Sequence, residues 1–371
     1  MESDYLTPMN ISPPIEGRAP DGLARRPRVD RDDDGSNLVR EAARLTRDLH
    51  AARPLFYWAD LAGSAIVGYA ALWLAIGSAP VWARLAAGVV AVVALYRAAM
   101  FIHELTHMKP AAVPYFRTIW NIVIGIPLML PSFMYEGVHN LHHARTRYGT
   151  DQDPEYLPLA LMRPWTLVVF LLVSILMPVG LVLRYGLLGP LSLFSPALRR
   201  MNVERFSSLA IDPKFRRKLP EGAFRRQWLV LETATSVFTL GLIALVVAGI
   251  VSLPAYLTYL AVVSAVAVVN QVRTLVAHLW ENEGEAISVT AQYLDSVNVP
   301  PPGFLPELWA PIGLRYHALH HLLPGVPYHN LPEAHRRLAS AMPAGTAYHQ
   351  ANHAGLTGLV IRLVRGSAAH A

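Results

Sequence analysis

Residues 233–272 read TATSVFTLGLIALVVAGIVSLPAYLTYLAVVSAVAVVNQV and contain no charged side chain. One helical crossing of a bilayer core needs about 20 apolar residues, so this run is long enough for two crossings. Pro254 lies near its middle, where a proline favours a break between helices. The run therefore predicts a transmembrane helical hairpin.

A second apolar region, nearer the N-terminus, has the same form. Residues 61–83 are uncharged between Asp60 and Arg84, and residues 85–102 follow with Arg97 as their only charge. Arg97 is near one end of its run and can extend its charge toward the membrane surface. Because 53% of the chain is hydrophobic and only 16% is charged, it is too apolar for an ordinary soluble protein. We expect an all-α integral membrane protein with two such hairpins.

Two other apolar runs are less regular. Residues 118–135 contain two internal prolines, and residues 164–183 contain Pro178. Broken helices are tolerated at membrane depth only where protein covers their backbone, so both runs suit interfacial or re-entrant segments. Nine Lys and Arg residues follow within 199–226, and the positive-inside rule predicts that this basic loop and the Arg-rich N-terminal segment face the cytoplasm.

Three short clusters hold eight of the chain's 15 histidines. They read HELTH at 103–107, HNLHH at 139–143 and HALHH at 317–321. Residues at i, i+3 and i+4 share one face of a helix, so each cluster presents two or three imidazoles together. Imidazole is a ligand for iron, zinc, copper and nickel, and eight imidazoles exceed the needs of one ion. The clusters therefore predict a site for two metal ions with open positions.

His278 is a ninth candidate ligand because it directly follows the second hairpin. The first cluster closes the first hairpin and so lies on the same side as the N-terminus. If the three clusters bind the same pair of metal ions, the second and third clusters must also lie on the side of the N-terminus. Runs 118–135 and 164–183 must then enter and leave the membrane on that one side. Four crossings, two interfacial or re-entrant runs and a cytoplasmic histidine-rich cap satisfy all of these constraints.

The three clusters, their order and their places beside the apolar segments resemble the membrane-bound fatty acid desaturase superfamily, whose members carry three histidine boxes and a non-haem diiron centre. The likeness runs from about residue 55 to about residue 340. Two longer stretches, HNLHHARTRYGTDQDPEY and YHALHHLLPGVPYHNLPEAH, resemble bacterial members in particular. The iron ligands that the resemblance implies are all histidines: His103, His107, His139, His142, His143, His278, His317, His320 and His321.

The resemblance also draws attention to polar groups around these ligands. When all ligands are imidazoles, charge balance falls to oxo or hydroxo groups and to carboxylates that hydrogen-bond to the ligands. Candidates for that role are Glu104, Asp153 and Asp295, together with Glu136 and Asp151. Animal members hold one iron through a water on an Asn four residues before the ninth histidine; here Thr274 has that position, and Asn282 is a candidate substitute.

The resemblance implies dioxygen-dependent oxidation of a fatty acyl lipid at two iron ions. Loss of two hydrogens from the chain gives a double bond, and return of oxygen to it gives an alcohol. We expect a fatty acyl desaturase first, with a lipid or carotenoid hydroxylase or ketolase as the alternative. A remote alternative comes from HELTH, which also matches the HExxH motif of zinc metalloproteases but leaves six box histidines without a role.

The partners expected are a lipid bilayer, the acyl lipid and a protein that supplies electrons. Because the chain has no cysteine, it cannot hold a thiolate iron–sulfur cluster of its own. We therefore expect an external donor of the ferredoxin, rubredoxin or cytochrome type. The net charge of +6 sits beside apolar runs, as in loops that face anionic lipid, so no nucleic-acid partner is expected.

Three segments describe the chain in these terms. Residues 1–53 form a polar extension, disordered in its first part and ending in a short helix at about 37–50; residues 54–345 form the desaturase-like domain; and residues 346–371 form a C-terminal tail. The localisation expected is the bacterial inner membrane, with both termini and the histidine boxes on the cytoplasmic side.

Overall fold

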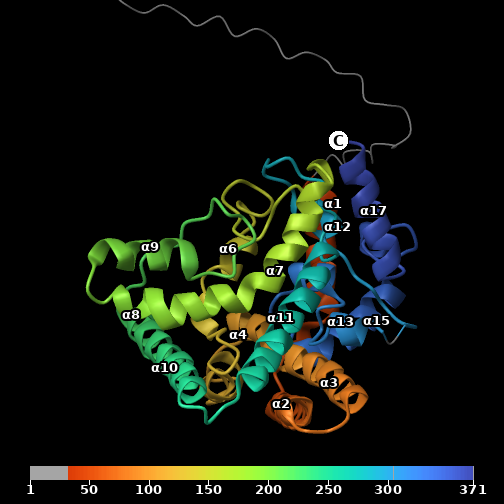
Figure 1. Ribbon diagram of the computed structural model, residues 1–371. Helices are drawn as coiled ribbons and strands as arrows, with labels where there is room; N and C mark the ends of the chain where they lie inside the picture. The colour runs from red at the N-terminus through yellow and green to blue at the C-terminus, as the bar shows by residue number, and fades with distance from the viewer. Residues whose placement is uncertain (1–31, 304, 371) are drawn as a thin grey trace, which may run out of the picture. The chain divides into compact units, whose positions relative to one another are not determined.

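The computed structural model describes residues 32–303 and 305–370 (Figure 1). Within these residues it is helical throughout, without a β-strand, which confirms the predicted fold class. The disorder predicted for the start of the chain lies outside the described residues. The predicted helix at 37–50 is present as α1, Asp32–Leu45, followed by a 3-10 turn at Arg47–His50.

Five helical stretches are long and apolar enough to cross a membrane, one more than the four crossings predicted. They are Pro54–Ile76 (α2), Val81–His107 (α3, Val81–Ala99, with α4, Phe101–His107), Trp165–Leu191 (α7, Trp165–Leu183, through a π-helical turn into α8, Gly189–Leu191), Gly222–Val247 (α10) and Leu253–Leu275 (α11). The additional stretch contains the run at 164–183 that was expected to be interfacial or re-entrant. It is helical without interruption although Pro178 cannot donate to the helix ladder, and the helix bends along its length (Figure 1).

The other irregular run is broken, as predicted. It forms α5, Phe116–Trp120, a π-helical turn at Asn121–Gly125 and a 3-10 turn at Ser132–Met134, and it is not among the candidate spans. The buried Asn121 side chain accepts from the Ser132 amide at 2.8 Å and donates to the Ser132 hydroxyl at 3.0 Å. These bonds satisfy backbone and side-chain groups that lipid could not satisfy.

The first predicted hairpin is formed by α2 and α3, which pack along their length. The two helices come close at Gly68, where a β-carbon would stand 2.7 Å from the Leu95 side chain. The second predicted hairpin, α10 and α11, has its turn at 248–252, but its arms diverge (Figure 1). Helix α11 packs against α7, α3 and α2, whereas α10 packs against the segment 184–191.

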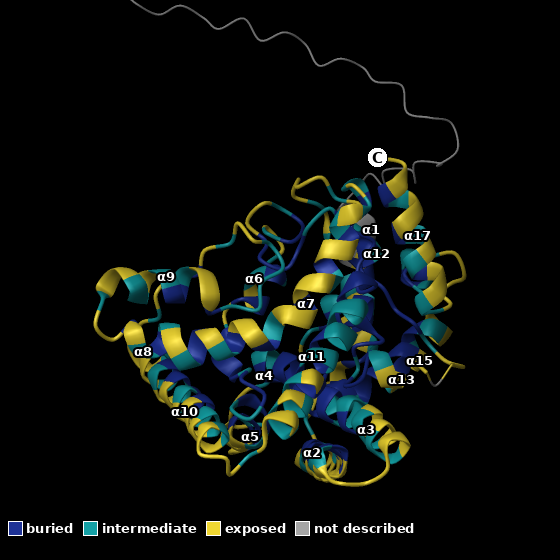
Figure 2. Cartoon of the chain, in the orientation of Figure 1, coloured by how far each residue is buried: buried dark blue, intermediate teal, exposed yellow. Residues whose placement is uncertain are grey.

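Exposed apolar side chains cover the outer faces of the long helices (Figure 2). Trp73 on α2 is 74% exposed and Val247 on α10 is 83% exposed, which is expected where the surroundings are hydrocarbon rather than water. The buried core continues beyond the ends of these helices into the short ones. Those are α6 (His139–His142), α9 (Pro196–Phe206), α12 (Val289–Asp295), α13 (Pro306–Trp309), α14 (His317–Leu322), α15 (Leu331–Ala341), α16 (Ala347–Gln350) and α17 (Leu356–Ala368).

The end of the predicted N-terminal extension, residues 38–49, packs against these short helices. Leu38 and Ala42 of α1 and Leu49 are buried against residues of α12, α14 and α15. Arg337 of α15 ties the segment further, through its ion pair with Asp48 at 2.6 Å.

Candidate metal centre

All nine predicted histidines come together, in two groups. The nitrogen atoms within each group lie within 4.8 Å of one another. The first group is His103, His107, His139, His143 and His320; the second is His142, His278, His317 and His321.

The spacing within the boxes explains how the histidines divide. In the second box, the i and i+4 residues His139 and His143 belong to the first group, and the i+3 residue His142 belongs to the second. The third box is the reverse, because His317 and His321 belong to the second group and His320 to the first. Side chains at i+3 and i+4 diverge by about 100° around a helix. An HxxHH box can therefore serve two neighbouring ions, whereas an HxxxH box serves one.

The Nε2 atoms face one another across each group. Those of His139 and His143 are 3.0 Å apart, and that of His320 is 3.1 Å from His107 and 3.2 Å from His143. In the second group, His317 Nε2 is 3.0 Å from His278 and 3.2 Å from His321. With a metal–nitrogen bond of about 2.1 Å, such separations correspond to angles of about 90–100° at the metal. That is the angle between neighbouring ligands of a five- or six-coordinate ion.

Carboxylates hold the opposite ring nitrogen of several of these imidazoles. Asp153 lies 2.8 Å from Nδ1 of His142, and Glu155 lies 3.0 Å from Nδ1 of His139. The third carboxylate acts through a tyrosine: the Tyr148 hydroxyl lies 2.8 Å from both His278 Nδ1 and Asp295. Occupying Nδ1 in this way leaves Nε2 free for a metal and fixes the orientation of the ring.

Two of the predicted carboxylates, Asp153 and Asp295, therefore lie beside the histidines, and the sequence analysis missed Glu155. Its signal was its place in the TDQDPEY segment, two residues after Asp153. The tyrosines that complete these contacts, Tyr135 and Tyr148, were also missed. Tyr135 donates to Glu155 at 2.7 Å.

The remaining polar candidates have other partners. Glu104 accepts from the Tyr57 hydroxyl at 2.5 Å, and Glu136 pairs with Arg117. Asn282 donates to the carbonyls of Gly149 and Glu285 rather than to a histidine. Asp151 is exposed.

Thr274 is bound within its own helix. Its hydroxyl donates to the Asn270 carbonyl at 2.9 Å. The hydroxyl proton is therefore directed back along α11 and satisfies a backbone group of that helix.

Burial has the largest effect on the pKa values of the histidines and carboxylates at the centre. It lowers the pKa of His278 and of His317 well below the ordinary value, with help from neighbouring imidazoles. It raises the pKa of Glu155 to about 7 and that of Asp295 to about 6. His142 differs: burial is the largest single influence and opposes its protonation, but the carboxylates of Asp153, Glu155 and Asp295 together raise its pKa. Mostly neutral imidazoles keep a lone pair for a metal ion.

The residues present fit a pair of metal ions. Both ring nitrogens of His103 are buried without a hydrogen-bond partner. Buried polar atoms are costly when unpaired, and a metal bond would satisfy the His103 nitrogen that faces the first group. An all-imidazole donor set suits iron, zinc, copper or nickel.

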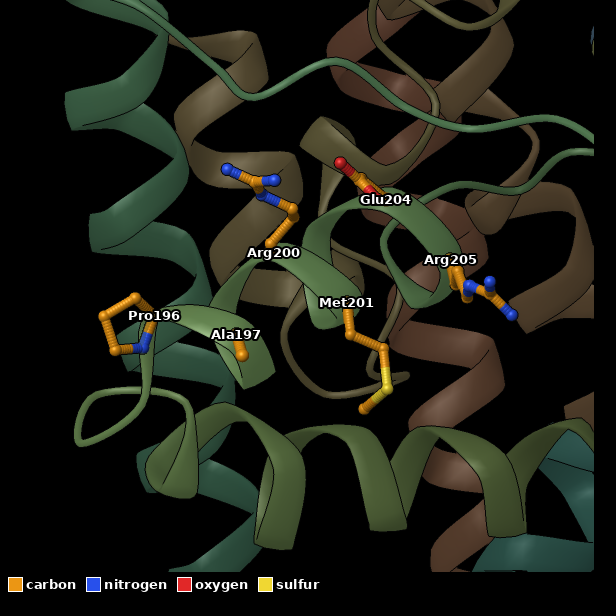
Figure 3. A pocket seen from close by; sticks show the side chains of 6 residues that line it. All are labelled: Pro196, Ala197, Arg200, Met201, Glu204 and Arg205. Atoms are coloured by element: carbon orange, nitrogen blue, oxygen red, sulfur yellow. The ribbon is translucent and has the colours of Figure 1, made fainter.

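A hollow on the surface of α9 lies apart from this centre (Figure 3). Its lining comes from α9 alone and contains none of the nine histidines: Pro196, Ala197, Arg200, Met201, Glu204 and Arg205. Arg200 and Arg205 point away from one another in this view, so they do not form a joint binding site.

Comparison with known proteins gives two findings. The family model described as fatty acid desaturase matches residues 79–352. A ceramide hydroxylase of Caulobacter vibrioides (strain NA1000 / CB15N) is 46% identical over 320 residues, which cover 86% of this chain and 91% of that protein. The family match includes every histidine of the two groups.

Proposed function

The chain belongs to the fatty acid desaturase family of diiron enzymes, and from this premise we propose that it is a membrane-bound lipid hydroxylase acting on a ceramide. The observation that carries the proposal of lipid oxidation is the arrangement of nine buried or half-buried imidazoles in two groups, in a chain with five helices apolar enough to cross a membrane. The relative's name supports hydroxylation of a ceramide ahead of the desaturation expected from the sequence.

Hydroxylation inserts one oxygen atom of dioxygen into a C–H bond and releases the other as water, with two electrons from an external donor and two protons from the surrounding water. Two iron ions held by the nine histidines would supply the activation of dioxygen. The chain's own groups prepare the site: Asp153, Glu155 and Tyr148 contact Nδ1 of His142, His139 and His278, so that Nε2 of these three rings faces the centre. Burial excludes water, which protects a reactive intermediate from side reactions.

The metalloprotease alternative finds no support in the first box. A zinc protease needs the glutamate of HExxH free to act as a general base. Here the Glu104 carboxylate is buried and held by the Tyr57 hydroxyl at 2.5 Å. We assign Glu104 to the packing of α4 against α2.

Electrons must reach the centre from another protein, and we propose that this donor is acidic. Lys214, Arg216 and Lys218 are exposed on a loop whose Ile211 amide donates to the Pro154 carbonyl at 2.7 Å. Pro154 precedes Glu155, which contacts His139. The positive-inside rule supports a cytoplasmic position for this loop and for the centre.

The decisive experiment is mass spectrometry of total lipids from cells that express the protein, compared with cells that express His320→Ala. A gain of one oxygen that depends on His320 supports hydroxylation, and a loss of two hydrogens supports desaturation. His349→Ala is the matched control, because His349 is outside both groups and should leave the product unchanged. If the purified protein carries zinc rather than iron and no lipid changes, the proposal is wrong.

A further inference from the structure

A short extended segment around Ser296 and Asn298 lies between the two parts of the chain that carry His278 and the third histidine box. Ser296 forms an antiparallel bridge with His278, and Asn298 forms one with Tyr316, directly before the box. A third stretch of chain joins at Asn298, which also bridges to Asn352. Ser296 and Asn298 are completely buried, so this segment belongs to the interior that surrounds the metal centre.

The third histidine box forms the helix α14, and the first amides of a helix have no acceptor within it. Tyr316, at the N-cap position of α14, makes no side-chain hydrogen bond to them. The extended segment supplies acceptors for two of these amides. The Ala318 amide donates to the Val297 carbonyl at 3.1 Å. The Leu319 amide donates to the side-chain oxygen of Asn298 at 3.0 Å, so the side chain that caps α14 comes from 21 residues earlier in the chain.

Leu319 lies between ligands of different groups. His317 and His321 belong to the second group, and His320 belongs to the first. A helix of six residues is too short to be stable by itself, so the position of α14 depends on the contacts around it. Because Leu319 is completely buried, water does not replace the Asn298 oxygen at its amide. The bond at this amide therefore orients all three imidazoles of the box.

Asn298 is itself fixed by hydrogen bonds to the C-terminal part of the chain. Its amide donates to the Ala351 carbonyl at 2.8 Å, and its carbonyl accepts from the His353 amide at 2.8 Å. Its side-chain nitrogen lies 3.2 Å from Asn352 Oδ1 and 3.4 Å from the Tyr293 hydroxyl. Since a side-chain amide carries its donor and its acceptor on opposite sides, these contacts direct the oxygen toward α14.

The neighbouring residues of the segment act on a single ligand. Ser296 Oγ lies 3.3 Å from Nδ1 of His278, and Asp295 reaches the same ring through the Tyr148 hydroxyl. His278 belongs to the second group alone. Asn298 differs from these residues, because the box that it orients supplies ligands to both groups.

We infer that Asn298 is the positioning residue of the third histidine box: its side-chain oxygen holds α14 in the orientation in which the box presents ligands to both metal ions. Asn298 acts through the backbone of the box, so its loss should change how tightly both ions are bound. The inference rests on the proposed function for the identity of the metal as iron, but its test does not depend on turnover.

Asn298→Ala tests this role in the full-length protein, with iron per chain measured in detergent across a graded series of chelator concentrations. The change leaves the buried Leu319 amide without its acceptor, and we expect about tenfold weaker iron retention. Mössbauer spectra of the iron-loaded protein distinguish the two sites, and both signals should change because the box supplies both groups. Unchanged iron retention, or a change at one site alone, would overturn the inference.

Asn352→Ala is the matched control, because it removes a contact of the same side chain and leaves the bond to Leu319 in place. We expect this variant to retain iron and to keep both Mössbauer signals, even if it unfolds at a lower temperature. Equal loss of iron in Asn352→Ala and Asn298→Ala would show a general effect of packing and would contradict the positioning role.

Asn298→Asp is the second variant, because a carboxylate keeps an oxygen for the Leu319 amide but has no N–H group to donate. We expect it to restore iron retention relative to Asn298→Ala. If Asn298→Ala does not fold, Asn298→Asp decides: iron retained at both sites supports the inference, and iron lost from them overturns it.

Lipid analysis separates this inference from the proposed function. Weaker iron binding by Asn298→Ala, in a protein that oxidises no lipid, would reject the proposed function alone. An oxidised lipid that depends on His320, together with unchanged iron binding by Asn298→Ala, would reject the positioning role alone.

Discussion

The Asp153 carboxylate lies 2.8 Å from Nδ1 of His142, and both side chains are almost completely buried. Asp153 also accepts from the amides of Gly149 and Glu155, so its position is fixed by the backbone around it. This contact turns Nε2 of His142 toward the second histidine group. It makes Asp153 the carboxylate whose loss should most directly affect metal binding.

We expect Asp153→Asn to lower iron affinity by about 10- to 100-fold, the usual effect of losing a carboxylate behind a metal-binding histidine. The measurement is iron per chain after dialysis against a graded series of chelator concentrations. Asp151→Asn is the control, since Asp151 is two residues away and exposed. Equal iron retention by both variants would contradict the role given to Asp153.

His278→Ala should release the ion of the second group and weaken binding of the other ion. His278 belongs to the group of four, and its Nε2 lies 3.0 Å from that of His317. Iron analysis should show a loss of at least half the metal, with lipid oxidation abolished. His335→Ala provides the comparison, because His335 is also buried but bonds to Tyr348 outside the two groups. Full iron content in His278→Ala would show that this histidine is not a ligand.

Tyr57→Phe should destabilise the protein, although Tyr57 belongs to neither histidine group. The change deprives the buried Glu104 carboxylate of its hydroxyl donor at 2.5 Å, and an unpaired buried polar group costs about 1–3 kcal/mol. Thermal unfolding in detergent is the measurement. Tyr115→Phe, at an 81% exposed tyrosine, should leave the unfolding temperature unchanged. Similar stability of the two variants would show that the Tyr57 hydroxyl is not needed.

Gly68→Ala should weaken the first hairpin by about 1–3 kcal/mol, the range for forcing extra volume into a packed interface. The new β-carbon would stand 2.7 Å from Leu95 and 3.2 Å from its backbone nitrogen. Gly63→Ala on the same helix meets no atom within 4 Å and should be neutral or slightly stabilising. Denaturation by graded detergent mixtures compares the two. A neutral Gly68→Ala would mean that α2 and α3 pack less closely here.

Sequence periodicity predicts how the histidines are spaced on their helices, but it does not predict which side chains contact them. The spacing of the HxxHH boxes predicts a shared helix face, because i, i+3 and i+4 are neighbours on any helix. Glu155 and Tyr148 reach their histidines through irregular loops, and no local rule places such side chains. The bonds of Asn282 to Gly149 and Glu285 are likewise set by the fold of a loop.

The same distinction holds for the membrane helices. The absence of charge predicts the apolar parts of α10 and α11, but lateral packing depends on which neighbours each helix meets. For this reason α10 and α11, which the sequence predicts as a hairpin, diverge, and α11 packs among α2, α3 and α7. Prolines broke the run at 118–135 but only bent α7, because one internal proline removes one hydrogen bond and leaves the rest of a helix intact.

The second and third histidine boxes each divide their histidines between the two groups, and this division affects the free energy of metal binding. Each of these boxes gives histidines to both groups, so an ion bound by one group orders a helix that presents a ligand to the other. Such linkage makes binding of the second ion more favourable than binding of the first. Iron loading of this protein should therefore be cooperative, with chains that hold a single ion scarce at equilibrium.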